Sequence, residues 1–394
     1  MLHTRVSLAS TLWQTILFSL LAGDNQELTE ESLQDIARLL VGKQTAVSAQ
    51  IPADVKELTK TMKTCDKWPE LTTLPPEKIP VWLDINCPLA ADMLKSIIHR
   101  YEHRNNKELD LMTKTWGLDS LPLLAMIHTM LKTSSDSEPV TQLTRTESDI
   151  DIVSHLKSIK KPIARWMIRQ LMGLASTAAG RREVTKDASL RMVHQLRLGY
   201  LWLAHLMSRD ARLPAPELLW FCTHHEIGLL LRGPNPQLLH KISRRQRSWQ
   251  QWDRLQFPEV MTGLPVPVQL SSHPSVSSEE QVQGTLVCPG SVRGRACVLL
   301  NCSDSASLQA GDILITHSTD VGWTPLFPLL AGVVTELGGL ISHGAVVARE
   351  YGLPCVVGAT NATLIFKTGD EVYLDGKSGL VQKVSSIAKQ KQKS

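Results

Sequence analysis

The chain has 394 residues, enough for about two or three domains, each with a core of its own. Hydrophobic residues make up 43% and charged residues 20%, which is ordinary for a soluble globular protein. A net charge of +4 is small for this length and does not favour binding to nucleic acid. The seven cysteines are scattered and form no C-x-x-C pair, so we expect reduced thiols in a cytoplasmic protein, not a disulfide framework.

The first long apolar run covers residues 12–23 and is too short to cross a bilayer. Arg5 precedes it, as in a signal peptide, but Gln14 interrupts the run and no small-residue cleavage site follows. We therefore expect an amphipathic core helix and no membrane association.

Residues 1–132 are predicted to form a helical region with proline-rich turns. Within it, Thr29 can cap a helix that runs to about Gly42, because the apolar residues between them recur on one face. The polar segment 133–149 lacks periodicity and predicts an exposed loop.

Residues 150–270 are predicted to form a second helical domain. A spacing of three or four residues predicts a buried helical face made of Val193, Leu196, Tyr200, Leu203 and Met207. Farther along, residues 241–252 mix bases with tryptophans; we interpret them as a solvated amphipathic helix, and nucleic-acid binding as the weaker alternative.

The tetrapeptide THHE at 223–226 allows two interpretations. Its histidines and glutamate do not share a helical face as metal ligands would. Thr223 and Glu226 instead have the spacing of a capping box ahead of an apolar run. We expect the cap, and no metal on this chain.

The polar segment 271–283 is predicted to be an interdomain linker, because short β-rich runs replace the helical pattern after it. Residues 284–384 then predict a compact α/β domain, and residues 385–394 a flexible tail. One helix is expected near 343–351, among seven strands at 285–288, 296–300, 312–316, 332–336, 355–358, 363–366 and 371–375. The fold class is therefore multidomain, a mainly α-helical N-terminal region followed by a compact α/β domain.

His343 is the strongest candidate for chemistry. Gly338 and Gly339 allow a tight turn before it, and Gly352 ends the short helix that it begins. A helix N-terminus suits a bound anion such as phosphate and disfavours imidazolium, which keeps the ring neutral and nucleophilic. Ser342 could donate a hydrogen bond to a phosphoryl oxygen. The residues therefore fit a transiently phosphorylated histidine.

A purely structural histidine beside a glycine turn stays open as the alternative on these residues alone. A Ser342–His343 catalytic dyad is disfavoured, because adjacent side chains point apart and no acid is placed to orient the imidazole.

The stretch TELGGLISHGAVVAREYGLPCVVG at 335–358 resembles the signature of the swivelling phosphohistidine domain of phosphoenolpyruvate-utilising enzymes, and the resemblance covers essentially all of 284–382. It implies a β/β/α swivelling fold, with His343 as the phosphoryl carrier. The phosphate loop that the resemblance implies consists of Gly338, Gly339, Ser342 and Gly344. Arg349 is similar to the family's arginine in the helix; a purely structural role for it would be to pair with an acid.

Two departures resemble the rifampicin phosphotransferase branch of the family: Ile341 stands where a regulatory threonine is usual, and Gly344 where alanine is common. Residues 160–268 are also similar to that branch's acceptor-binding helical domain. There Arg182 and Lys186 are four residues apart and share a helical face, from which they could clamp a phosphoryl group in transit. The alternative for this pair is a solvated charged helix.

No part of residues 1–160 resembles the ATP-grasp domain with which full enzymes of this family begin, and there is no P-loop motif. The resemblance therefore implies a phosphotransferase component that needs an ATP-grasp domain in trans. ATP and Mg²⁺ would bind there, with no cofactor on this chain, and His343 would pass the phosphoryl group to a small-molecule hydroxyl acceptor on the helical domain. The alternative is a non-catalytic remnant or regulatory binding module that keeps the fold.

Overall fold

The computed structural model describes residues 2–22, 35, 47–105, 108–132, 153, 156, 162–252, 255, 257, 262–267, 281–340, 342–376 and 378–384. The predicted loop at 133–149, the tail at 385–394 and, apart from Asp35, the helix after Thr29 lie outside these residues.

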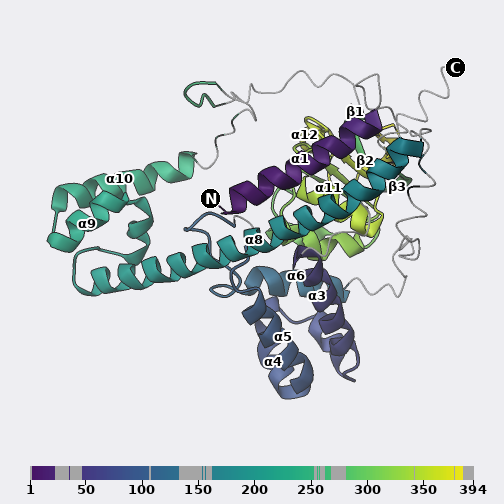
Figure 1. Ribbon diagram of the computed structural model, residues 1–394. Helices are drawn as coiled ribbons and strands as arrows, with labels where there is room; N and C mark the ends of the chain where they lie inside the picture. Colours follow the sequence, from purple (N-terminus) through teal and green to yellow (C-terminus); the bar gives the residue numbers. More distant parts are fainter. Residues whose placement is uncertain are drawn as a thin grey trace. The chain divides into compact units, whose positions relative to one another are not determined.

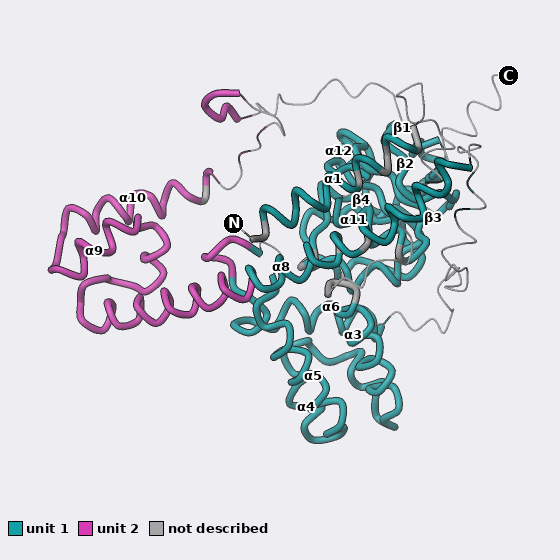
Figure 2. The backbone as a smooth tube through the Cα atoms, viewed as in Figure 1, with its two compact units in different colours: residues 1–108, 114–189, 279–394 teal, residues 109–113, 190–278 magenta. Residues whose placement is uncertain are grey.

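The chain forms two compact units (Figure 2). Unit 1 contains residues 1–108, 114–189 and 279–394, and unit 2 contains residues 109–113 and 190–278. The division falls within the long helix α8 (Pro162–Arg209). One junction between the units, at 278/279, lies within the linker predicted at 271–283. None lies at the predicted loop 133–149, because the N-terminal helices and the C-terminal sheet belong to the same unit.

The N-terminal part of unit 1 is helical, as predicted. Its described α-helices are α1 (Leu2–Ala22), α3 (Val47–Lys63), α4 (Ile79–Asn86), α5 (Pro88–Arg100) and α6 (Leu121–Lys132), with short 3₁₀ turns η2 (Trp68–Thr72) and η3 (Pro76–Lys78). In α1, Leu12 is mostly exposed, so the prediction of a core helix for the apolar run 12–23 is wrong at this position. Among the helices that the structure describes, none has the length and hydrophobicity required to span a membrane.

The C-terminal part of unit 1 is built on an eight-stranded mixed sheet (Figure 1). The strand order is β1-β8-β7-β3-β4-β5-β6-β2, with β3 to β6 parallel and the flanking pairs antiparallel. The strands are β1 (Gln281–Gln283), β2 (Thr285–Cys288), β3 (Ser291–Val298), β4 (Ile313–Thr316), β5 (Gly332–Thr335), β6 (Cys355–Val357), β7 (Glu371–Asp375) and β8 (Leu380–Lys383).

Both faces of the central strands are buried, which explains why they are continuously apolar. In β4, Ile313 and Ile315 pack into one core with Phe366. Leu314, between them, points to the other face, into a core shared with the N-terminal helices. The helical region and the sheet therefore enclose one hydrophobic core within unit 1.

Most of the predicted strands are confirmed, but two details are wrong. Residues 363–366 were expected to form a strand, and instead Ala362–Ile365 form the short helix α12. Four apolar residues do not distinguish a strand from a helical turn; here Asn361 enters the left-handed region at φ 64° and Glu336 accepts hydrogen bonds from Thr363. The predicted linker 271–283 also ends too late, because residues 281–283 form β1 and pair with β8.

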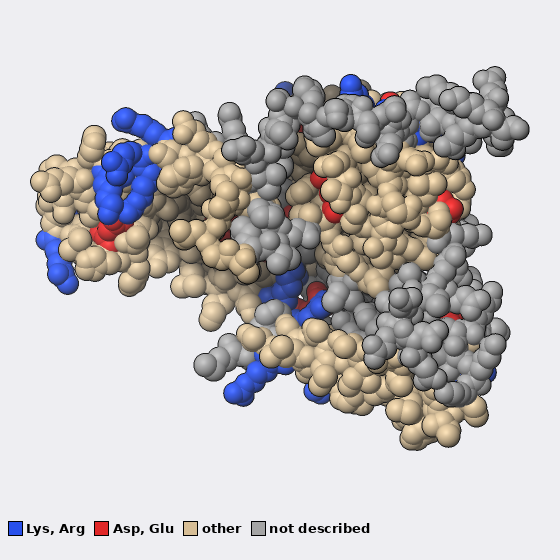
Figure 3. Space-filling view, turned by 90° about the horizontal axis from the view of Figure 1, so that it is seen from above, with Lys and Arg blue, Asp and Glu red and all other residues tan. Residues whose placement is uncertain are grey.

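Unit 2 has a separate core, built from the second half of α8 with η4 (Pro216–Phe221), α9 (His224–Arg232) and α10 (Pro236–Trp252). The predicted capping box is confirmed: the Thr223 side chain accepts from the Glu226 amide, and the Glu226 carboxylate accepts from the Thr223 amide. The same carboxylate accepts from Arg245 and Lys241 of α10. Figure 3 shows Lys and Arg side chains gathered over α9 and α10, at the left of the view.

The buried face of α8 in unit 2 follows the predicted one at Met207, which is buried, and at Tyr200 and Leu203, which pack against the same core. It differs from the prediction closer to the start of this part of the helix. Leu196 is 52% exposed, whereas the polar residues His194 and Arg197 are buried. Arg197 donates to the backbone carbonyls of Asp110 and Leu111, which offsets the cost of burying its charge. Apolar periodicity cannot detect such a face, because it counts a polar residue as exposed.

Candidate functional site

His343 is the first residue of α11 (His343–Tyr351), with Ser342 as the N-cap. The helix ends at Gly352 in the left-handed conformation (φ 64°), so both predicted ends are confirmed. The first turn of any helix leaves backbone N–H groups without intrahelical acceptors. The half-buried imidazole therefore lies at an end that is electrostatically suited to an anion.

The imidazole also contacts the neighbouring turn η6 (Val321–Leu329). His343 Nε2 lies 3.0 Å from the hydroxyl oxygen of Thr324. This contact orients the ring, and Thr324 is a site residue that the sequence analysis missed.

Two of the three predicted loop glycines are required by geometry. Gly338 has φ +127°, a conformation that favours glycine. A side chain at Gly344 would overlap the Thr319 hydroxyl. At Gly339 an added Cβ would meet nothing within 4 Å, so packing does not explain that glycine.

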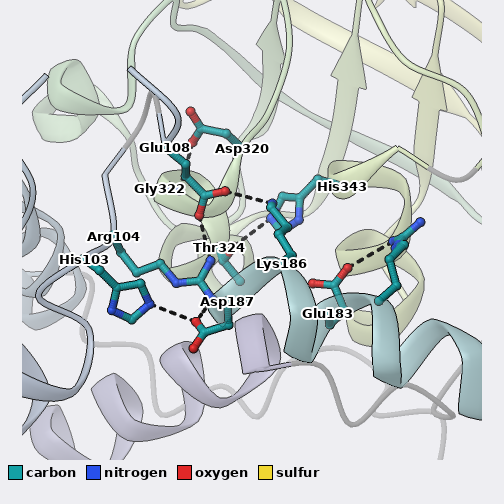
Figure 4. A network of polar contacts seen from close by, with 11 residues as sticks. His103, Arg104, Glu108, Glu183, Lys186, Asp187, Asp320, Gly322, Thr324 and His343 are labelled. Carbon is teal, nitrogen blue, oxygen red and sulfur yellow. Dashed lines mark hydrogen bonds and ion pairs between the residues drawn. The ribbon is translucent and has the colours of Figure 1, made fainter. Parts of the chain in front are cut away.

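Arg182 and Lys186 both act electrostatically on His343. Figure 4 shows Lys186 beside the imidazole. Burial, as the largest cause, and the positive charges of Lys186 and, more weakly, Arg182 together lower the pKa of His343 to about 4. The imidazole is therefore neutral at pH 7. Sequence reasoning paired these two cations with each other, and the fold brings the pair to the histidine.

An acidic network holds the cations in place. Glu108 accepts from Lys186 at 2.8 Å and from Arg104 at 2.7 Å. Arg104 also pairs with Asp187 at 2.6 Å, and His103 lies 2.8 Å from the same carboxylate. Burial favours the neutral form of Glu108, but the two cations outweigh it and hold its pKa below the ordinary value. The result is a densely charged layer beside the imidazole.

Asp320 lies at the edge of this layer and caps η6. Its carboxylate accepts from the Gly322 amide at 2.8 Å. Burial, as the largest cause, and the negative charge of Glu108 together raise the pKa of Asp320 to about 7. Asp320 is thus divided between its two protonation states at neutral pH.

Arg349 is 2% exposed and lies on α11, away from the imidazole's contacts. Its Nη1 donates to the carbonyl of Leu340 at 2.6 Å, in the loop before the histidine. Arg349 thus ties the loop to the helix through a backbone carbonyl.

Some of the residues around His343 lie in sequence motifs and others do not. Asp320 and Thr324 lie in the stretch 320–330, which belongs to the resemblance described above. His103, Arg104 and Glu108 stand in a segment without a motif, about eighty residues before their partners on α8. No group of three or more histidine, cysteine or acidic side chains suited to a metal ion occurs among the described residues.

Two protein families match the chain. Residues 308–379 match the mobile domain of PEP-utilising enzymes, and residues 3–183 match the fourth domain of rifampicin phosphotransferase. The first match contains His343; the second ends between Arg182 and Lys186.

Several curated relatives are rifampicin phosphotransferases. The enzyme of Bacillus cereus is 29% identical over 300 residues, 74% of this chain and 34% of the relative. That of a Streptomyces species is 36% identical over 224 residues, 56% of this chain and 25% of the relative. That of Bacillus subtilis is 28% identical over 302 residues, 74% of this chain and 34% of the relative. The matched region thus spans about a third or less of these relatives.

Proposed function

Because the chain contains the mobile domain of the phosphoenolpyruvate-utilising enzymes and a region homologous to the fourth domain of rifampicin phosphotransferase, we propose that it is a phosphotransferase-type protein in which His343 carries a phosphoryl group. The observation that supports the proposal is an imidazole at a helix N-terminus whose pKa is lowered by burial and by the nearby charges of Lys186 and Arg182.

Each part of the site supplies something that phosphoryl transfer needs. A neutral imidazole has a lone pair for attack on phosphorus, and its low pKa keeps that lone pair available. The ammonium of Lys186 and the guanidinium of Arg182 neutralise the negative charge that builds up on the phosphoryl oxygens during transfer. Ser342 and the first amides of α11 provide further donors.

The donor in this proposal is ATP bound with Mg²⁺ on an ATP-grasp domain in trans, and the acceptor is a hydroxyl group of a small molecule held by the helical region. Donor and acceptor cannot both lie within the roughly 3 Å that transfer requires. In this proposal the histidine domain therefore leaves the N-terminal helices, against which it packs in this structure, to reach the donor.

The test uses labelled ATP, the chain and a separately produced ATP-grasp domain. We expect acid-labile, base-stable label on the chain only when that domain is present, and none on the His343→Asn variant. Label on the Asn variant would refute the carrier role of His343. Label on the chain without the added domain would refute transfer in trans.

A further inference from the structure

The site beside His343 contains four described carboxyl groups, and three of them are committed to cations. Glu108 pairs with Lys186 and Arg104, Glu183 with Arg182 at 3.1 Å, and Asp187 with Arg104 and His103. A carboxylate held between cations is a poor proton acceptor, because protonation would break the pair.

Asp320 is the exception within the described part of the site. Its carboxylate accepts from the backbone amide of Gly322, and it forms no salt bridge with a side chain that the structure describes. It lies on the turn that also carries Thr324, the residue in contact with the imidazole (Figure 4). The charged groups that face it are Glu108, from the segment after α5, and Lys186, from α8.

We propose that Asp320 is the general base that takes the proton from the attacking hydroxyl when the phosphoryl group leaves His343. This inference rests on the proposed function. The hydroxyl oxygen forms a bond to phosphorus, the P–N bond to His343 breaks, and its electron pair returns to the imidazole. The hydroxyl proton moves to the Asp320 carboxylate, and water takes the place of the acceptor when none is bound.

The environment of Asp320 suits this role. A base works best when its pKa is close to the working pH, and burial brings Asp320 there. Glu108, one of its two charged neighbours, is held ionised over the same range. Two neighbouring carboxyls whose pKa values are pushed apart are the usual arrangement when one carries charge and the other moves a proton.

The experiment charges His343 chemically, so that no ATP-binding domain is required. The full chain is treated with phosphoramidate, a small-molecule phosphoryl donor, and loss of phosphohistidine is followed by phosphorus NMR between pH 5 and pH 9. Free phosphohistidine decays faster in acid. We expect the folded chain to show an additional rising limb through about pH 7, where Asp320 loses its proton.

The Asp320→Asn variant keeps an acceptor for the Gly322 amide, so the cap is preserved. We expect it to take up phosphate normally, to lose the rising limb and to decay about 100-fold more slowly at pH 8. Asp304→Asn, on an exposed residue of η5 (Cys302–Ser307), is the matched control and keeps the limb.

The outcomes separate the two proposals. Equal profiles for wild type and Asp320→Asn, with His343 charged in both, would overturn the role of Asp320 and leave the carrier role standing. No phosphohistidine on the wild type, or equal label on His343→Asn, would overturn the carrier role and this inference with it.

Discussion

At the scale of single residues, the state of His343 is set by its surroundings more than by its own chemistry. Its pKa falls from the ordinary 6.5 to about 4 because of burial first and the nearby cations second. A base with a depressed pKa stabilises the fold above its ordinary pKa, and this contribution is lost as the pH falls through the lower value.

The first prediction follows from that sign. Part of the free energy of unfolding should be lost between about pH 6.5 and pH 4, because the folded imidazole resists protonation. His343→Gln should lose less stability over this window than wild type, as measured by urea unfolding. Parallel curves for the two proteins would mean that His343 is not held neutral by the fold.

The second prediction uses opposite charges. Lys186→Met should raise the pKa of His343, because it removes a nearby cation, and Glu108→Gln should lower it, because it removes an anion. Titration of the imidazole signals by NMR measures both. Shifts of the same sign in the two variants would contradict the placement of this pair beside the ring.

The third prediction concerns the loop glycines. Gly344→Ala should lower stability by about 1–3 kcal/mol, because the new methyl group overlaps the Thr319 hydroxyl. Thr319→Ala should recover much of the loss in the double variant, and Gly339→Ala, where space is open, should be close to neutral. Thermal unfolding compares wild type, the two single glycine variants and the double variant. Equal losses of stability in Gly344→Ala and Gly339→Ala would argue against the overlap.

At the scale of elements, α9 and α10 are joined through Glu226, which is almost fully buried. Its carboxylate satisfies the Thr223 amide and accepts from Arg245 and Lys241. The hydrogen bonds from Arg245, above all, depress the pKa of Glu226. The stability that this provides is present above the ordinary carboxyl pKa of 4.5 and is lost as the pH falls below it.

The fourth prediction tests this junction. Glu226→Gln should cost about 1–3 kcal/mol at pH 7, because the glutamine accepts weakly and leaves the Arg245 charge without a counter-charge. The difference from wild type should shrink below about pH 4.5, because the unfolded chain takes up a proton at Glu226 there while the folded carboxylate resists protonation. Denaturant unfolding at pH 7 and pH 3 measures it, and a constant difference would exclude the ionic contribution.

At the scale of the whole molecule, the two units have separate hydrophobic cores. Leu230 is fully buried in unit 2, and Leu314 lies in the sheet of unit 1. A cavity in one core removes contacts that belong to that unit alone.

The fifth prediction follows from these separate cores. Leu230→Ala should cost unit 2 about 2–5 kcal/mol and speed amide hydrogen exchange in α9 and α10, with the amides of β4 to β6 remaining protected. Leu314→Ala is the matched variant and should show the reverse pattern. Faster exchange in both units from either change would show a single cooperative structure.

Local sequence was enough to predict three features: the α/β fold of residues 284–384, the ends of the helix that begins at His343, and the capping box at Thr223 and Glu226. These features depend on residues that are close together in the chain: apolar runs bounded by turn residues, a cap and a left-handed glycine. Helical spacing paired Arg182 with Lys186, and motif resemblance added the likeness to the phosphoenolpyruvate-utilising enzymes.

The groups that surround the imidazole could not be predicted from the sequence and are seen only in the folded chain. Glu108, Arg104 and Asp320 reach the site from segments far apart in the sequence, and their roles depend on burial and on distances of a few ångströms. The buried face of α8 with His194 and Arg197, and the helix at 362–365, were misjudged for the same reason. Whether a polar side chain is buried, and what it meets there, is settled by packing between distant segments, which a local pattern does not encode.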